Sequence, residues 1–326
     1  MKATRRAVVT ALLVFGASLP FSNATSAQEL EKLRVGKSVT SSLAFSALQV
    51  GEAAGIWEKA GLDIEFFAFA GDAKMQQAFA AGELDIGLGS GPSMAYAAKG
   101  VPIKTVATLA GPPRNMALVV GAKSDLKAID DLKGKRVGVT TAGSLTAWIV
   151  DELNRQKGWE GDDRLQPVAM GEMRTRLAAM ESGELPASVT STVQGYDLED
   201  RGMARVLVDF GDLVPHFHTH VIFAHNDMIE DRSETLEKFL KGWFQTVQYM
   251  KTNKESSIKV SAEEMKVSEH IVAKVFDTEM GMMSDDGSFD PDAIDVLKKS
   301  YVELGILDYE PEISELYTDR FIPVKY

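Results

Sequence analysis

Cysteine is absent from this chain of 326 residues. Disulfide bonds, zinc sites built on thiolates and cysteine nucleophiles are therefore excluded, and so is a lipid anchor on a cysteine. The fold must be stabilised by packing alone. No stretch rich in Pro, Ser or Gly divides the chain either, which argues against a flexible tether between domains.

Positive charge is also scarce. The chain holds 35 Lys and Arg residues against 47 Asp and Glu residues, which gives a formal net charge of −12. An acidic surface disfavours nucleic acid and anionic lipid as partners, since both require basic patches. A small anion remains a possible ligand, because a local site can carry the opposite sign.

The N-terminus carries an apolar stretch, residues 7–19, that is too short to span a bilayer. It follows the basic residues Lys2, Arg5 and Arg6 and precedes a run of small residues that ends at Ala27. This order predicts a secretory signal peptide over residues 1–27, cleaved after Ala27 or, as a second choice, after Ala24. Without this segment, which has three basic residues and no acidic one, the net charge becomes −15. We expect a soluble periplasmic protein, exported by the Sec or the twin-arginine route.

Segments typical of strands and helices alternate from residue 33 onward, which predicts an α/β protein with largely parallel sheets. Leu62, Ile64 and Phe66 alternate with acidic residues, as in a strand with one face in water. Apolar residues of 233–251 recur at helical spacing and predict a long amphipathic helix. Roughly 300 residues are enough for two lobes with separate cores.

A short internal repeat suggests how the lobes are arranged. Gly-Glu-Leu occurs at residues 82–84 and again at 183–185, each time between a helix and a strand. A new strand also begins at Arg136. We therefore predict two lobes of like topology, joined by a hinge of crossing strands. Lobe 1 is expected over residues 28–116 and 222–326, and lobe 2 over residues 117–221.

Small hydroxyl and glycine residues follow the expected strands. Ligands of open α/β sheets gather at the carboxyl ends of strands, and helix N-termini there attract anions. Such residues also serve as ordinary caps and turns, and Asp72 is a candidate helix cap. The candidate ligand-binding residues of this kind are Ser41, Ser42, Gly71, Ser90, Gly91, Thr141, Ser144 and Thr190.

Two further candidates, Arg114 and Asn115, lie near the first expected crossing between the lobes. An arginine fork suits a carboxylate or a sulfonate, although Arg114 is equally compatible with an exposed surface position. Arg174 and Arg176 are expected to form exposed pairs with neighbouring acids on a helix. Trp148 lies early in an expected helix, and the sequence leaves open whether its side chain faces the cleft or the core.

Three histidines alternate at positions 216, 218 and 220, so on a strand they would share one face. Because such positions fan apart along the strand, they do not converge as zinc requires. We expect no metal ion, and His218 is predicted to donate a hydrogen bond to a bound solute near the second crossing.

Several longer motifs occur in a characteristic order, namely GEAAGIWEKAGLDIEF, AAGELDIGLGSGPSMAYAAKG and IDDLKGKRVGV. With them the chain resembles the periplasmic substrate-binding proteins of nitrate/sulfonate/taurine-type ABC importers, which share a fold with binders of thiamine-pyrimidine precursors. The resemblance implies two α/β lobes of the type II periplasmic fold that close on a small solute. It also implies delivery of the solute to a membrane permease. We expect a monomer that needs no cofactor.

Several functions remain open. The hydroxyls and helix N-termini favour a small organic anion, a sulfonate or carboxylate, as the ligand. A neutral heteroaromatic such as a pyrimidine precursor would depend on an aromatic wall, for which Trp148 is the candidate. A sensor module for a membrane kinase would require the same closure. An enzyme is not expected, because relatives with chemistry use cysteine or histidine nucleophiles and bases, and cysteine is absent.

Overall fold

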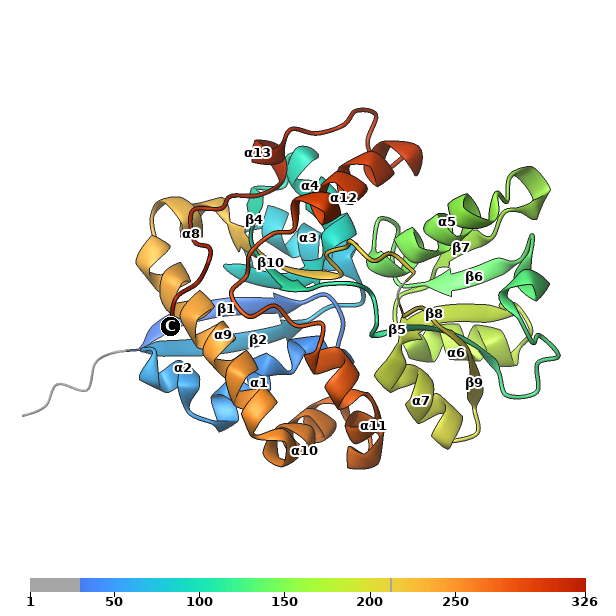
Figure 1. Cartoon of the computed structure of the whole chain (residues 1–326), viewed down its shortest axis with the longest axis horizontal. Coiled ribbons are helices and arrows are strands. Elements are labelled where there is room, and N and C mark those ends of the chain that lie inside the picture. Colours follow the sequence, from blue (N-terminus) through green and yellow to red (C-terminus); the bar gives the residue numbers. More distant parts are fainter. Residues whose placement is uncertain (1–29, 212) are drawn as a thin grey trace, which may run out of the picture.

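The fold contains two separate five-stranded β-sheets. A computed structural model describes residues 30–211 and 213–326, so the expected signal peptide lies outside the described residues. In Figure 1 the strands β5 to β9 and helices α5 to α7 form one unit, and the other labelled elements form a second. We call the unit on the first sheet lobe 1 and the unit with β5 to β9 lobe 2.

The sheet of lobe 1 has the strand order β2-β1-β3-β10-β4. Strand β1 pairs in parallel with β2 and β3, whereas β10 is antiparallel to β3 and β4. The strands are β1 (Glu31–Lys37), β2 (Leu62–Ala68), β3 (Ile86–Ser90), β4 (Ile103–Ala110) and β10 (His220–His225).

The sheet of lobe 2 repeats this arrangement in the order β7-β6-β8-β5-β9. Strand β6 is parallel to β7 and β8, and β5 is antiparallel to β8 and β9. The strands are β5 (Met116–Gly121), β6 (Arg136–Val139), β7 (Gln166–Ala169), β8 (Ala187–Ser191) and β9 (Ala204–Asp209). Every strand thus has a counterpart in lobe 1, and the two Gly-Glu-Leu triplets precede the counterparts β3 and β8. The predicted two-lobe α/β fold is confirmed.

The chain crosses between the sheets twice. The first crossing lies between Ala110 and Met116, and the second between Asp209 and His220. Met116 therefore begins a strand of lobe 2, and Val221 lies in a strand of lobe 1, so each crossing precedes the expected boundary by a few residues. Both crossings connect strand to strand, which is the arrangement of a hinge.

Helices cover both sheets. Lobe 1 carries α1 (Ala47–Ala53), α2 (Ile56–Lys59), α3 (Asp72–Ala80), α4 (Ala95–Ala98), α8 (Asn226–Glu230), α9 (Ser233–Thr252), α10 (Lys254–Met265), α11 (Glu269–Met280), α12 (Pro291–Glu303) and α13 (Ile313–Leu316). Lobe 2 carries α5 (Leu145–Lys157), α6 (Met173–Glu181) and α7 (Thr192–Asp200). Single 3-10 turns occur at Leu43–Phe45, Gly91–Met94, Ile129–Leu132 and Gly161–Asp163. Among the helices of the described residues, none combines the length and apolar character that a membrane crossing requires.

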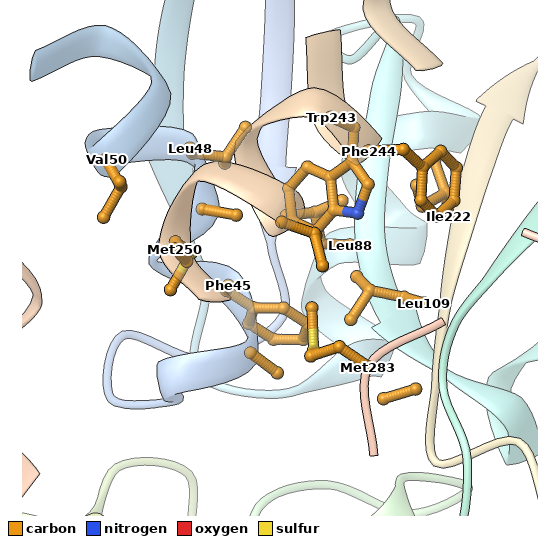
Figure 2. Packing of buried hydrophobic residues seen from close by; sticks show 14 of the residues in the cluster. Phe45, Leu48, Val50, Leu88, Leu109, Ile222, Trp243, Phe244, Met250 and Met283 are labelled. Carbon is orange, nitrogen blue, oxygen red and sulfur yellow. The ribbon is translucent and has the colours of Figure 1, made fainter. Parts of the chain in front are cut away.

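The core of lobe 1 lies between its sheet and α9. The predicted helical spacing is confirmed, because Leu236, Leu240 and Trp243 are all buried on one face of α9. Figure 2 shows Trp243 and Phe244 in the packed cluster that also contains Leu88 of β3. Burial of these large side chains supplies the packing energy that a chain without disulfide bonds needs.

This packing predicts the effect of a single truncation. Phe244 is 0% exposed, and Phe244→Ala should lower the free energy of unfolding by about 3–5 kcal/mol because it leaves a cavity. Val302, which is 42% exposed, provides the comparison, and Val302→Ala should change the same quantity by less than about 0.5 kcal/mol. Urea denaturation of both variants measures these values, and equal stabilities would contradict the described core.

Candidate ligand-binding site

A cavity of about 50 Å³ lies between the two lobes, and we call it the inner cavity. Lobe 1 lines it mainly with polar residues, namely Ser38, Ser41, Ser42, Asp72 and Ser90. Lobe 2 contributes Thr140, Thr146, Arg176, Thr190, Ser191 and Gln194. Most of these residues lie at or just after the carboxyl ends of β1, β3, β6 and β8. Ligands of open α/β sheets bind at this position.

Four of the candidate residues meet in this cavity. Ser41, Ser42, Ser90 and Thr190 all line it, and the last three are at most 3% exposed. Ser42 Oγ is buried and has no hydrogen-bond partner in the described part of the chain. Because a buried hydroxyl without a partner is unfavourable, it is available to a bound solute. That these residues contact the ligand stays a prediction.

Four other candidates are not among the residues that line the inner cavity, namely Gly71, Gly91, Thr141 and Ser144. Ser144 caps α5 through a backbone N–H of its first turn. Gly71 has φ +124°, and a Cβ there would come within 2.6 Å of the Thr141 side chain. At Gly91 a Cβ would lie 2.0 Å from the His218 carbonyl oxygen. These two glycines therefore permit close approach of the chain, in the first case between the lobes.

Arg114 lines a second cavity of about 250 Å³, not the inner cavity. This hinge-side cavity is also lined by Thr192, Tyr196, Asp209, Lys274 and Glu279. The neighbouring candidate Asn115 is buried, with Nδ2 2.9 Å from Nε2 of His220. His220 itself lines the inner cavity, so Asn115 supports a lining residue. The sequence offered Arg114 as the cationic contact, and this role stays a prediction.

The three histidines do not lie on one strand, so the condition for a common face is not met. Only His220 belongs to a strand, at the start of β10, while the segment before it is irregular. His218 lies between Thr108, whose Oγ1 is 2.8 Å from Nδ1, and the backbone N–H of Asp290, which donates to Nε2. His216 is exposed, with Nδ1 3.0 Å from Oδ2 of Asp290. Burial lowers the pKa of His218 and of His220 to about 4, so both are neutral at pH 7.

Trp148, for which the sequence left two positions open, lies in the core. Its ring is 1% exposed and packs against Phe217 with the ring centroids 4.3 Å apart. Nε1 donates to Ser300 Oγ over 2.9 Å. The side chain does not line the inner cavity, so it provides no aromatic wall there.

Arg176 is the site residue that the sequence analysis placed wrongly. Instead of forming an exposed ion pair, it is 3% exposed and lines the inner cavity. Nη1 donates to Ser188 Oγ over 2.9 Å and to the carbonyl of Val189. Nε is buried without a hydrogen-bond partner, and no carboxylate of the described residues lies within ion-pair distance. Burial lowers the pKa of Arg176 to about 10, so the side chain is still charged at pH 7.

A signal for Arg176 was present in the chain. Met173, Leu177 and Met180 form the buried face of α6, and position 176 lies on the same face at helical spacing. The acidic neighbours Glu172 and Glu181 favoured an exposed ion pair, but they lie near the ends of the helix. A charged residue within an apolar stripe was the better indication of a site.

The lining of the inner cavity contains one basic and one acidic side chain that differ in their environments, Arg176 and Asp72. Asp72 is the only acidic residue of its lining, and burial raises its pKa, although a backbone hydrogen bond from Ser90 opposes this shift. Its Oδ1 accepts that hydrogen bond over 3.0 Å, so Asp72 holds β3 and does not cap α3 as expected. Burial thus favours the neutral form of Asp72, whereas Arg176 keeps its charge.

The structure shows a closed arrangement of the lobes. Ser191 Oγ of lobe 2 donates to the carbonyl oxygen of Ser41 in lobe 1 over 2.8 Å. Elsewhere at the interface, Thr192 Oγ1 of α7 donates to Oε1 of Glu279 on α11 over 2.9 Å. Burial raises the pKa of Glu279 to about 8, although the hydrogen bond from Thr192 opposes the shift. The contact between the lobes therefore includes a buried carboxyl group that is mainly neutral at pH 7.

Comparisons with known proteins agree with this architecture. The model of the family described as NMT1/THI5 like matches residues 43–257. A protein of Haemophilus influenzae named for thiamine biosynthesis is 25% identical over 216 residues, which is 64% of this chain and 65% of that relative, less than two thirds of its length. The alkanesulfonate-binding protein SsuA from Xanthomonas axonopodis, solved bound to MOPS, has a TM-score of 0.73 at 18% identity over 87% of this chain and 96% of its own.

The periplasmic nitrate-binding protein NrtA from Synechocystis is similar as well. Its structure has a TM-score of 0.65 at 14% identity and covers 75% of this chain and 69% of its own. At these identities the two solved structures establish a common fold.

The buried carboxyl group predicts a pH dependence. Because the folded-state pKa of Glu279 is raised, its contribution to stability is fully present below about pH 4.5 and is lost as the pH rises through about 8. Glu279→Gln is neutral at every pH, so its stability relative to the unmodified protein should increase from pH 5 to pH 9, by at least about 1 kcal/mol. Urea denaturation at pH 5, 7 and 9 tests this, and a difference that does not change with pH would contradict it.

Proposed function

This chain belongs to the family described as NMT1/THI5 like, and from this premise we propose that it is a periplasmic solute-binding protein for a small organic anion. The ligand is a sulfonate or carboxylate that the two lobes enclose. The protein then delivers it to the membrane permease of an ABC importer. Closure around one ligand requires no chemistry from the protein, so binding is its whole activity.

The charged Arg176 carries the ligand assignment. A buried charge without a partner is unfavourable by several kcal/mol, and buried charges in proteins are therefore paired. Arg176 donates only to the neutral acceptors Ser188 Oγ and Val189 O among the described residues. An anionic oxygen in the inner cavity would supply the missing partner for Nε, and a guanidinium binds carboxylates and sulfonates through two parallel hydrogen bonds.

Helix N-termini support the same ligand class. The helices α3, α5 and α7 begin at the inner cavity, where Asp72, Leu145 and Ser191 line it. Their first backbone N–H groups and partial positive charges favour an anion. The hydroxyls of Ser42 and Ser90 add donors without adding charge.

The related structures are consistent with this assignment. The Xanthomonas protein was solved with MOPS, which is a sulfonate, and the Synechocystis protein is named for nitrate. A sulfonate group and nitrate are both negatively charged and carry three oxygen atoms on one central atom.

A pyrimidine precursor is the second candidate, because the Haemophilus relative is named for thiamine biosynthesis. The inner cavity has no large aromatic surface for a pyrimidine ring, however, since no Trp, Tyr or Phe occurs among the described residues that line it. Stacking on a flat heteroaromatic ring would depend on His220 alone. The lining therefore favours the anion.

Replacing Arg176 tests the ligand class. Arg176→Met keeps a similar side-chain volume and removes the charge, and it should weaken binding of a sulfonate or carboxylate about 10- to 100-fold, since a charged hydrogen bond contributes about 1.5–3 kcal/mol. Arg164, which pairs with Asp151 and is exposed, provides the control, and Arg164→Met should leave the affinity unchanged. Isothermal titration calorimetry measures both.

A pyrimidine would give the opposite pattern. If it bound to the unmodified protein and Arg176→Met left its affinity unchanged while no anion bound, the anion assignment would be wrong.

Closure makes a separate prediction. Because the contacts between Ser191 and Ser41 and between Thr192 and Glu279 form only when the lobes meet, the ligand should stabilise the closed state. Small-angle scattering should show a smaller radius of gyration with saturating ligand, and the melting temperature should rise by mass action. A bound anion that changed neither quantity would refute hinge closure.

A further inference from the structure

The hinge-side cavity is separate from the inner cavity. Its volume is about 250 Å³, and its lining comes from both lobes. Thr192 and Tyr196 belong to α7 of lobe 2, whereas Lys274, Val275 and Glu279 belong to α11 of lobe 1. Within the described part of the chain, the two cavities share no lining residue. A solute in the hinge-side cavity would therefore be held by a set of side chains that the proposed function does not use.

One wall of the hinge-side cavity holds a buried carboxyl group with an unused oxygen. Glu279 is 1% exposed, and its Oε1 accepts a hydrogen bond from Thr192 over 2.9 Å. Oε2 is buried and has no hydrogen-bond partner among the described residues. Burial raises the pKa of Glu279 to about 8, so at pH 7 most molecules carry a proton there that Oε2 can donate. Because a buried polar group without a partner is unfavourable, a solute that accepts this hydrogen bond would be stabilised.

Another part of the same lining is exposed and positively charged. Arg114 and Lys274 lie there, and Lys274 Nζ is 3.3 Å from the centroid of the Tyr196 ring. This contact holds the ammonium group at the cavity. The Tyr196 hydroxyl donates to Oδ2 of Asp209 over 2.6 Å, so the ionised acidic residue of the lining already accepts a hydrogen bond. While Glu279 is protonated, the basic side chains of the lining outnumber the ionised acidic one, which favours an anion.

The spacing along α11 limits the shape of such a solute. Lys274 and Glu279 are five positions apart, which corresponds to about 7.5 Å along the helix axis. A solute that reaches both side chains therefore needs two polar ends joined by a short chain. One end has to carry negative charge, and the other has to accept a hydrogen bond.

We propose that the hinge-side cavity is a second binding site and that its ligand is a small dicarboxylate. One carboxylate pairs with Lys274 at the exposed part of the cavity. The other accepts a hydrogen bond from the carboxyl group of Glu279, and such bonds between an acid and a carboxylate are short and strong. Because the two cavities share no lining residue in the described part of the chain, this site does not depend on what the inner cavity binds.

Isothermal titration calorimetry with succinate at pH 6.5 tests the proposal in the Arg176→Met protein, which lacks the cation of the inner cavity. One succinate should bind. Adding Lys274→Met should weaken this binding about tenfold, because the anionic end loses its charged partner. Lys259 of α10 is exposed and does not line the cavity, so Lys259→Met provides the matched control and should leave the affinity unchanged. If Arg176→Met does not fold, the same loss is sought on adding Lys274→Met to the unmodified protein.

Glu279→Gln distinguishes contact with the ligand from a structural role. A glutamine amide still donates a hydrogen bond and still accepts one from Thr192, so the affinity at pH 6.5 should stay within about twofold. With Glu279 present, the affinity should fall about tenfold from pH 6.5 to pH 9, because the donated proton is lost as the pH rises through about 8. The glutamine variant should lack this fall. The other charged or titratable groups of the lining, Arg114, Tyr196, Asp209 and Lys274, are the same in both proteins.

Three results would overturn the proposal. They are a failure of succinate to bind to the folded Arg176→Met protein, an unchanged affinity after Lys274→Met, and the same pH profile with glutamine as with glutamate at position 279. None of them bears on the proposed function, because its test replaces Arg176 and measures sulfonates and carboxylates at the inner cavity.

Discussion

A buried guanidinium that has no carboxylate partner among residues 30–211 and 213–326 is the constraint on which this candidate site depends. Arg176 is held by two neutral acceptors of β8 and stays charged at pH 7. An unpaired charge in a protein interior is unfavourable, and the anion that we propose as the ligand would supply the missing partner. The hydroxyls and the helix N-termini of the inner cavity lie around this one charge.

The topology explains why neither lobe forms the candidate site on its own. Both sheets have the same strand order, with the parallel strands of each ending toward the gap between the lobes. Lobe 2 contributes the charged Arg176, whereas lobe 1 contributes Ser42, Ser90 and the N-terminus of α3. The same closure also buries Glu279 at the hinge-side cavity against Thr192.

The sequence predicted those features that depend on local pattern. Strand ends followed by Ser and Thr suggested a common location for Ser41, Ser42, Ser90 and Thr190, and these residues line one cavity because parallel strands end at the same edge. The repeated Gly-Glu-Leu triplet indicated the like topology of the two lobes.

Tertiary contacts determine the positions of the side chains that the sequence placed wrongly or could not place. Arg176 was assigned to the surface because its charged neighbours on α6 concealed the apolar face on which it lies. The alternating histidines would share one face only on a strand, and β10 begins at His220. Trp148 could not be placed, because its partners Phe217 and Ser300 come from the distant crossing and from α12.

A crystal structure of the protein grown with butanesulfonate tests the central claim most directly. The account predicts a sulfonate between the lobes with an oxygen about 2.7–2.9 Å from the Arg176 guanidinium. A sulfonate bound only in the hinge-side cavity, with Arg176 turned toward a carboxylate of the protein, would contradict it.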